Sequence, residues 1–180
     1  NGAIDRAQRA LLLCGGAGAG KTTALLLLAR DLLRVANDDG EAPAPVVLHL
    51  GSFHGGTSTL SQWLTEELVT KYGLSVPFVQ ALLEAPQDLV LLLDGLDEVA
   101  SDQRVACVDA INQLRRDTGI GLVVACRDEV LATLPNRLKL GAALRLRPID
   151  ASPAHSSKRI GADDDPLWRT PLMLTLATEM

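Results

Sequence analysis

Short apolar runs alternate along the chain with longer segments whose apolar residues recur at the spacing of a helix. The runs are apolar throughout, which is typical of strands in a parallel sheet that is covered on both faces. They predict strands at roughly Ala10–Cys14, Val46–Leu50, Asp88–Leu93 and Ile120–Cys126. Further along, Leu144 and Leu146 alternate with Arg145 and Arg147, which predicts a fifth strand with one solvated face at a sheet edge.

Helix signals lie between these runs. They predict helices at about Lys21–Ala36, from Thr59 to near Gly73, at Pro77–Glu84, and from Ser101 to Gly119. The first helix carries four consecutive leucines, so it is apolar on most sides and is expected to be central. Thr59 and Gln62 have the spacing of a capping box, and Ser101 has the character of an N-cap. Apolar stripes follow these caps: Leu60, Trp63, Leu64 and Leu68, then Val105, Val108, Ile111 and Leu114.

Alternating strands and helices predict an α/β fold, a doubly wound, mainly parallel five-stranded sheet with helices on both faces. Residues 1–150 are expected to form this α/β unit. Residues 151–165 are polar and have the composition of a linker. Two pairs, Asp165-Pro166 and Thr170-Pro171, each resemble an N-cap followed by proline at the first helical position. Residues 166–180 are therefore expected to begin a small helical subdomain.

Composition excludes several classes of function. The chain has 180 residues, 47% apolar but only 3% aromatic, so its core must be aliphatic. A net charge of −5 without a basic stripe argues against a nucleic-acid partner, and no apolar stretch reaches the ~18 residues of a membrane helix. Three cysteines without C-x-x-C spacing suggest buried, reduced thiols in a cytoplasmic protein. Because the chain starts at Asn1, it is expected to be a fragment.

The most specific motif follows the first strand. Gly15 to Thr22 reads G-x-x-x-x-G-K-T, between an apolar run and a leucine-rich helix. Such a loop surrounds a phosphate with backbone N–H groups at a helix N-terminus. Lys21 would add charge at the β/γ-phosphates, and Thr22 would ligate Mg²⁺. The expected phosphate-binding residues are Gly15, Gly16, Ala17, Gly18, Ala19, Gly20, Lys21, Thr22 and Thr23. The alternative is a glycine-rich turn before a buried helix.

Two further strands end in charged residues. Asp94 closes the third strand and is expected to hold Mg²⁺, unless it only caps the strand end. Gly95 allows a sharp turn that brings Asp97 and Glu98 toward the γ-phosphate, although acidic residues after a turn are often simply solvated. Arg127 ends the fourth strand, where it would contact the γ-phosphate. Its alternative is a salt bridge to Asp128 or Glu129.

These motifs occur in one order: the Gly15–Thr22 loop, the run from Leu91 to Glu98, the strand ending in Arg127, and Thr170-Pro171-Leu172-Met173-Leu174. Together they resemble a NACHT domain of the STAND class of signalling P-loop NTPases. The resemblance implies that Asp97 and Glu98 are the hydrolytic pair, with Glu98 activating water, and that Arg127 is the sensor arginine. It places Pro171 against the adenine. It also places the fourth strand between the first and third, so that Cys14 and Cys126 are neighbours.

The resemblance implies a slow ATPase switch: a closed ADP form and an open ATP form that self-oligomerises, with Mg²⁺ as cofactor. The winged-helix, effector and sensor domains of the parent protein are expected to lie outside this chain. Innate immune defence is the implied setting, and the composition favours a bacterial antiphage protein. Two alternatives stay open: a small-molecule P-loop kinase, and a nucleotide-binding scaffold that does not hydrolyse. A GTPase is less favoured because the chain lacks an Asn/Thr-Lys-x-Asp motif.

Overall fold

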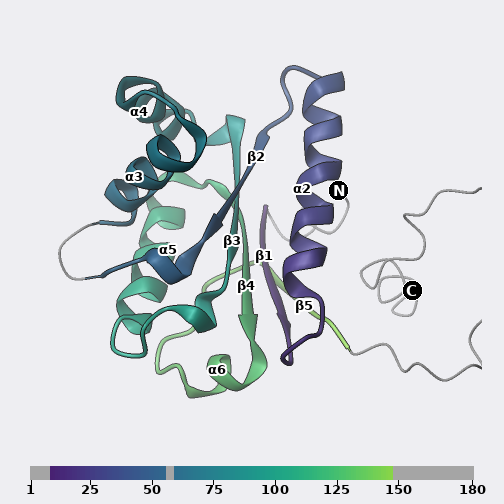
Figure 1. Ribbon diagram of the computed structural model, residues 1–180, viewed down its shortest axis with the longest axis vertical. Helices are drawn as coiled ribbons and strands as arrows, with labels where there is room; N and C mark the ends of the chain where they lie inside the picture. The colour runs from purple at the N-terminus through teal and green to yellow at the C-terminus, as the bar shows by residue number, and fades with distance from the viewer. Residues whose placement is uncertain (1–8, 56–58, 148–180) are drawn as a thin grey trace, which may run out of the picture.

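The computed structural model describes residues 9–55 and 59–147, which contain a five-stranded, all-parallel sheet (Figure 1). Its order is β2-β3-β4-β1-β5. The strands are β1 (Ala10–Gly15), β2 (Ala44–His49), β3 (Leu89–Asp94), β4 (Gly121–Arg127) and β5 (Ala142–Arg145). The sheet confirms the predicted α/β fold, the position of β4 between β1 and β3, and the fifth strand at an edge.

Helices cover both faces of the sheet, as predicted. Helix α2 lies on one face, and α3, α4 and α5 lie on the other (Figure 1). The helices are α2 (Lys21–Asp38), α3 (Leu60–Tyr72), α4 (Val76–Glu84), α5 (Arg104–Thr118) and α6 (Asp128–Thr133). Three short 3₁₀ turns complete the described part: η1 (Leu50–Ser52), η2 (Pro86–Asp88) and η3 (Leu96–Glu98).

Strand β3 shows how one apolar run supplies two cores. Successive side chains of a strand point to opposite faces. Val90 and Leu92 therefore pack with the α2 core, whereas Leu89, Leu91 and Leu93 pack with the core beneath α3 and α5. All five are at most 2% exposed. A run buried on both faces is what the unbroken apolar sequence predicted.

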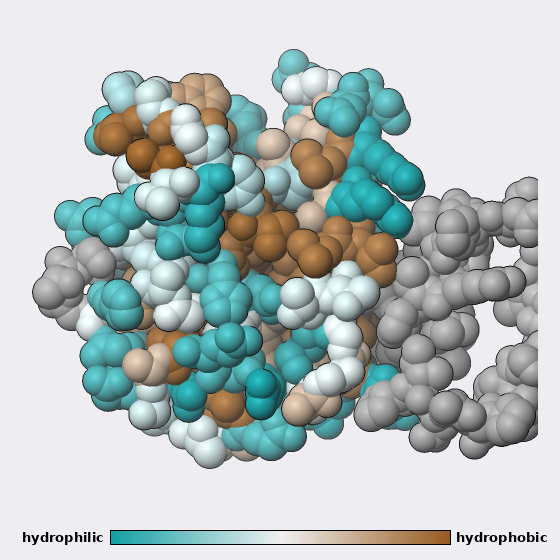
Figure 2. All heavy atoms as spheres, viewed as in Figure 1, coloured by the Kyte–Doolittle hydropathy of each residue, from teal (hydrophilic) through white to brown (hydrophobic). Residues whose placement is uncertain are grey.

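Helix α2 differs from its prediction as a central helix. Its inner side buries Ala24, Leu25, Ala29 and Leu32 against the sheet. Leu26 and Leu33, on the other side, are 53% and 47% exposed, so α2 forms an outer layer. Figure 2 shows apolar side chains gathered between α2 and the α3–α4 pair, whereas mostly polar side chains cover the part below, where the strands end.

The start of α5 corrects the prediction at Ser101. The helix begins at Arg104, and its N-cap is Gln103. The Gln103 N–H donates to the carbonyl of Ala100 at 2.8 Å, which closes a turn over Ser101. The other signals are confirmed: Thr59 and Gln62 form a capping box, and α3 and α5 end at Gly73 and Gly119.

The predicted linker and helical start, residues 151–180, lie outside the described residues. Among the helices that are described, none has the length and apolar character to cross a membrane.

The cysteines lie at the centre of the sheet and in α5. Cys14 and Cys126 are paired in the β1–β4 register, as predicted, and Cys107 lies on α5; all three are free and buried. Burial raises the pKa of Cys107 and of Cys126 from the usual 9.0 to about 12. It also raises the pKa of Cys14, which the nearby Arg145 partly opposes.

We expect Cys107 and Cys126 to resist alkylation in the native protein, because only the thiolate reacts. At pH 8, a thiol of pKa about 12 contains roughly a thousandfold less thiolate than one of pKa about 9. Between about pH 7 and pH 10 the native labelling rate should rise about tenfold per pH unit without levelling off, whereas the rate in urea should level off above about pH 9. Peptide mapping after iodoacetamide treatment measures both rates, and equal rates would contradict the assignment.

Candidate functional site

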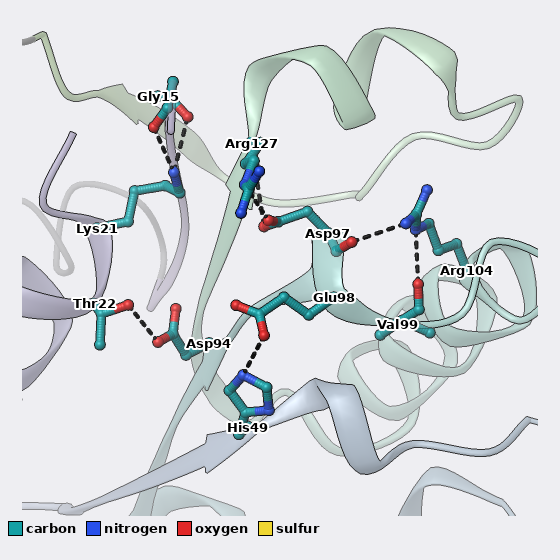
Figure 3. A network of polar contacts seen from close by, with 11 residues as sticks. Gly15, Lys21, Thr22, His49, Asp94, Asp97, Glu98, Val99, Arg104 and Arg127 are labelled. Atoms are coloured by element: carbon teal, nitrogen blue, oxygen red, sulfur yellow. Dashed lines mark hydrogen bonds and ion pairs between the residues drawn. The ribbon is translucent and has the colours of Figure 1, made fainter. Parts of the chain in front are cut away.

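The candidate site lies where β1, β2, β3 and β4 end. Because the strands are parallel, their carboxyl ends meet at one edge, which is where ligands of open α/β sheets bind. The end of β1 leads into the glycine loop, β3 ends at Asp94, and β4 ends at Arg127. Figure 3 shows the charged side chains of these ends, with Lys21 and Thr22, arranged around one space.

The glycine loop has the geometry of a phosphate cradle. Gly18 and Gly20 have φ of 71° and 86°, a region that glycine enters without a steric penalty. A Cβ built at Gly16, Gly18 or Gly20 would meet no heavy atom within 4 Å, so these positions face open space. The Ala24 N–H donates to the carbonyl of Gly20 at 2.8 Å and starts α2 directly behind the loop. A helix N-terminus preceded by open glycine backbone fits a phosphate group.

Gly15 is required for a different reason. A Cβ at this position would lie 2.8 Å from the backbone oxygen of Leu146, just after β5. Any side chain would therefore push the loop away from the strand that flanks β1.

Lys21 and Thr22 link the loop to its surroundings. The Lys21 Nζ donates to the carbonyls of Gly15 and Gly16 at 2.9 and 2.8 Å. The Thr22 hydroxyl donates to the Asp94 carboxylate at 2.8 Å. A hydroxyl and a carboxylate brought together from two elements are oxygen ligands that Mg²⁺ accepts, so Thr22 and Asp94 fit the metal that this fold implies. No cluster of three or more His, Cys, Asp or Glu suited to a metal occurs within residues 9–55 and 59–147.

Asp97 and Arg127 form an ion pair beside these residues. The Asp97 side chain is 6% exposed, and its Oδ2 lies 2.7 Å from the Arg127 Nε. Its Oδ1 accepts from the Arg127 backbone N–H at 3.1 Å. Both carboxylate oxygens are thus engaged by one residue. The salt bridge considered for Arg127 from the sequence is therefore not made to Asp128, which pairs with Arg145 at 3.4 Å instead.

Two residues of this network were missed by the sequence analysis. Arg104 donates to the backbone oxygens of Asp97 and Val99, at 2.8 and 2.9 Å, and so fixes the η3 turn. His49, at the end of β2, places Nε2 3.1 Å from a Glu98 carboxylate oxygen. A signal for His49 existed, because it is a polar residue that ends an apolar strand, as Asp94 and Arg127 do.

The structure therefore brings most of the predicted residues together. The loop, Lys21, Thr22, Asp94 and Glu98 face a common space, and Asp97 and Arg127 are joined beside it (Figure 3). Thr23 is exposed on the first turn of α2. Pro171 lies outside the described residues, so its contact with adenine stays a prediction.

This fold, with a glycine loop, a lysine and a strand-end carboxylate in these positions, defines a P-loop NTPase. The family model described as the NACHT domain matches residues 9–156. The chain therefore belongs to the NACHT family.

Solved structures show more distant similarity. The structure of C. elegans PCH-2 is 23% identical, with a TM-score of 0.43, over 82% of this chain and 38% of its own. The DnaC helicase loader is 18% identical, with a TM-score of 0.37, over 68% of this chain and 60% of its own. This chain thus spans less than two thirds of either protein. No curated protein matches the sequence.

We expect Arg127→Ala to lower the free energy of unfolding by about 1–3 kcal/mol, because Asp97 would stay buried with only one backbone donor. Adding Asp97→Asn should recover at least half of this loss, since the uncompensated charge is then removed. Urea denaturation of both variants and of Asp97→Asn alone completes the double-mutant cycle. Arg145→Ala is the matched control, and its exposed pair should leave stability nearly unchanged. Additive losses in the double variant would contradict the coupling.

Proposed function

We propose that the chain is the nucleotide-binding unit of an ATP-dependent switch that hydrolyses ATP slowly. The observation that carries the proposal is the 2.8 Å contact between Thr22 and Asp94, which joins the phosphate loop to the neighbouring strand end. It sets a hydroxyl and a carboxylate beside the open loop, where a triphosphate with Mg²⁺ would lie. When bound, Mg²⁺ would neutralise charge on the β- and γ-phosphates.

The charged side chains of the site would have different roles in nucleotide binding and hydrolysis. Lys21 would exchange its two loop carbonyls for phosphate oxygens, which are stronger, charged acceptors. Glu98, whose carboxylate is half exposed, would accept a proton from the attacking water. Both oxygens of Asp97 bind Arg127, so Asp97 suits a positioning role better than direct water activation. Arg127 would turn from Asp97 toward the γ-phosphate.

Such a site supports a switch, because ATP and ADP differ only in the γ-phosphate, which Arg127 would contact and which Lys21 would contact together with the β-phosphate. A ligand shifts a conformational equilibrium by its difference in affinity for the two states. We infer that the ATP form self-associates and that the ADP form is closed, as the family resemblance implies. Innate immune defence, in a bacterium or an animal, is the setting we propose for this output.

We expect Lys21→Ala to weaken ATP and ADP binding by at least about tenfold, since one charge-assisted contact of about 1.5–3 kcal/mol is lost. Titration of a fluorescent ATP analogue measures the affinity. Lys139→Ala, an exposed lysine away from the loop, is the control and should bind as the unmodified protein does. If the Lys21 variant binds nucleotide with unchanged affinity, the proposed phosphate site is contradicted.

We expect Glu98→Gln to lower the rate of ATP hydrolysis by about 10²–10⁴-fold while nucleotide binding is kept, because the amide cannot accept the proton. Bound ATP should then persist, and the assembled fraction should increase in size-exclusion chromatography with light scattering. The control is Glu84→Gln, at the exposed end of α4. A variant that hydrolyses and assembles as the unmodified protein does would favour a non-hydrolysing scaffold.

A further inference from the structure

His49 is held in a defined orientation next to Glu98. Its Nδ1 accepts a hydrogen bond from the Gly51 N–H at 3.2 Å, and its Nε2 lies 3.1 Å from a Glu98 oxygen. A ring nitrogen that accepts carries no proton. The Gly51 contact therefore assigns the proton of the neutral ring to Nε2, the nitrogen that faces the Glu98 carboxylate.

Two glycines make room for this ring. A Cβ built at Gly51 would lie 2.7 Å from the His49 Cε1, and a Cβ built at Gly95 would lie 3.0 Å from the His49 Nε2. The imidazole thus occupies a slot between the η1 turn and the turn after β3. No residue other than glycine would leave this slot open at Gly51 without moving the ring.

The η1 turn that carries Gly51 is itself fixed to α3. The Ser52 hydroxyl donates to Glu67 at 2.8 Å and accepts from the Trp63 indole at 3.2 Å. Trp63 is 3% exposed and packs edge-on against Phe53, so this anchor belongs to the core. The turn that donates to His49 Nδ1 is therefore anchored by the core and not by Glu98.

We propose that His49 is a positioning residue that holds the Glu98 carboxylate in place for water activation. In Figure 3 this carboxylate points to the side of the site where Thr22 and Asp94 lie. Within residues 9–55 and 59–147, no other side chain bonds the Glu98 carboxylate. The inference rests on the proposed function, in which Glu98 is the base. His49 acts through Glu98 and does not contact the nucleotide.

Two amide substitutions test the roles of the two ring nitrogens separately. The amide nitrogen of Gln reaches the position of Nε2, so His49→Gln keeps the donor to Glu98. Asn is shorter and replaces only Nδ1, so His49→Asn keeps the Gly51 contact and loses the Glu98 contact. We expect His49→Gln to retain kcat within about threefold, and His49→Asn and His49→Ala to lower it about tenfold. KM and nucleotide affinity should change less than about twofold, because ground-state binding is untouched.

His54→Ala, the exposed histidine five residues further along, is the matched control and should leave kcat unchanged. All variants are made in the full-length protein, and thermal melts check that each one folds. If His49→Ala does not fold, the comparison of kcat between His49→Gln and His49→Asn tests the inference. Added to Glu98→Gln, His49→Ala should lower the rate no further. If His49→Gln and His49→Asn have equal kcat, or if His49→Ala is faster than the unmodified protein, the inference about His49 is wrong and the proposed function still stands. If Glu98→Gln also changes nothing, the proposed function fails with it.

Discussion

The insertion of β4 between β1 and β3 is the constraint on which the site depends. The β1–β4 pairing sets Gly15 opposite Arg127, and the β2–β3 pairing sets His49 opposite Asp94. Strand β4 joins these two halves through its register with β3. Strands β1, β3 and β4 are buried on both faces, so a shift of register by one residue would turn their apolar side chains into the wrong core. The same burial that stabilises the sheet therefore fixes which charged residues meet at its edge.

The η3 turn connects these strand ends through polar contacts of Asp97 and Glu98. Gly95, with φ of 76°, reverses the chain after β3, and Arg104 holds the turn through two backbone oxygens. Consecutive acidic residues then point in different directions: Asp97 toward Arg127 on β4, and Glu98 toward His49 on β2. Asp97 is almost completely buried and Glu98 is half exposed, so their environments differ sharply. Unequal environments assign unequal roles to neighbouring carboxylates.

The sequence predicted the fold better than the contacts within the site. Apolar runs and capping signals are local, so the five strands, the capping box at Thr59 and the glycine helix ends could be predicted directly. The position of β4 required the family resemblance. The predicted N-cap at Ser101 was wrong because serine is equally suited to an N-cap and to a turn, and the chain forms a turn there. The partners of Arg127 and Glu98 could not be predicted, because Asp97 is 30 residues from Arg127 in the chain and meets it only through the β3–β4 register.

Every charged group expected to bind phosphate already has a protein partner, and this sets the energetics of the proposed switch. In that switch, Lys21 would have to leave two carbonyls and Arg127 would have to leave Asp97. Each charge-assisted bond contributes about 1.5–3 kcal/mol, so exchanging one partner for a phosphate oxygen gives a smaller net gain. Reversing an equilibrium from about 1:99 to 99:1 needs about 5.5 kcal/mol of differential affinity. No single exchange reaches this value. In the proposed switch, the γ-phosphate would therefore have to engage Lys21 and Arg127 together, with Thr22 and Asp94 holding Mg²⁺ beside it, and one sheet edge holds all four residues.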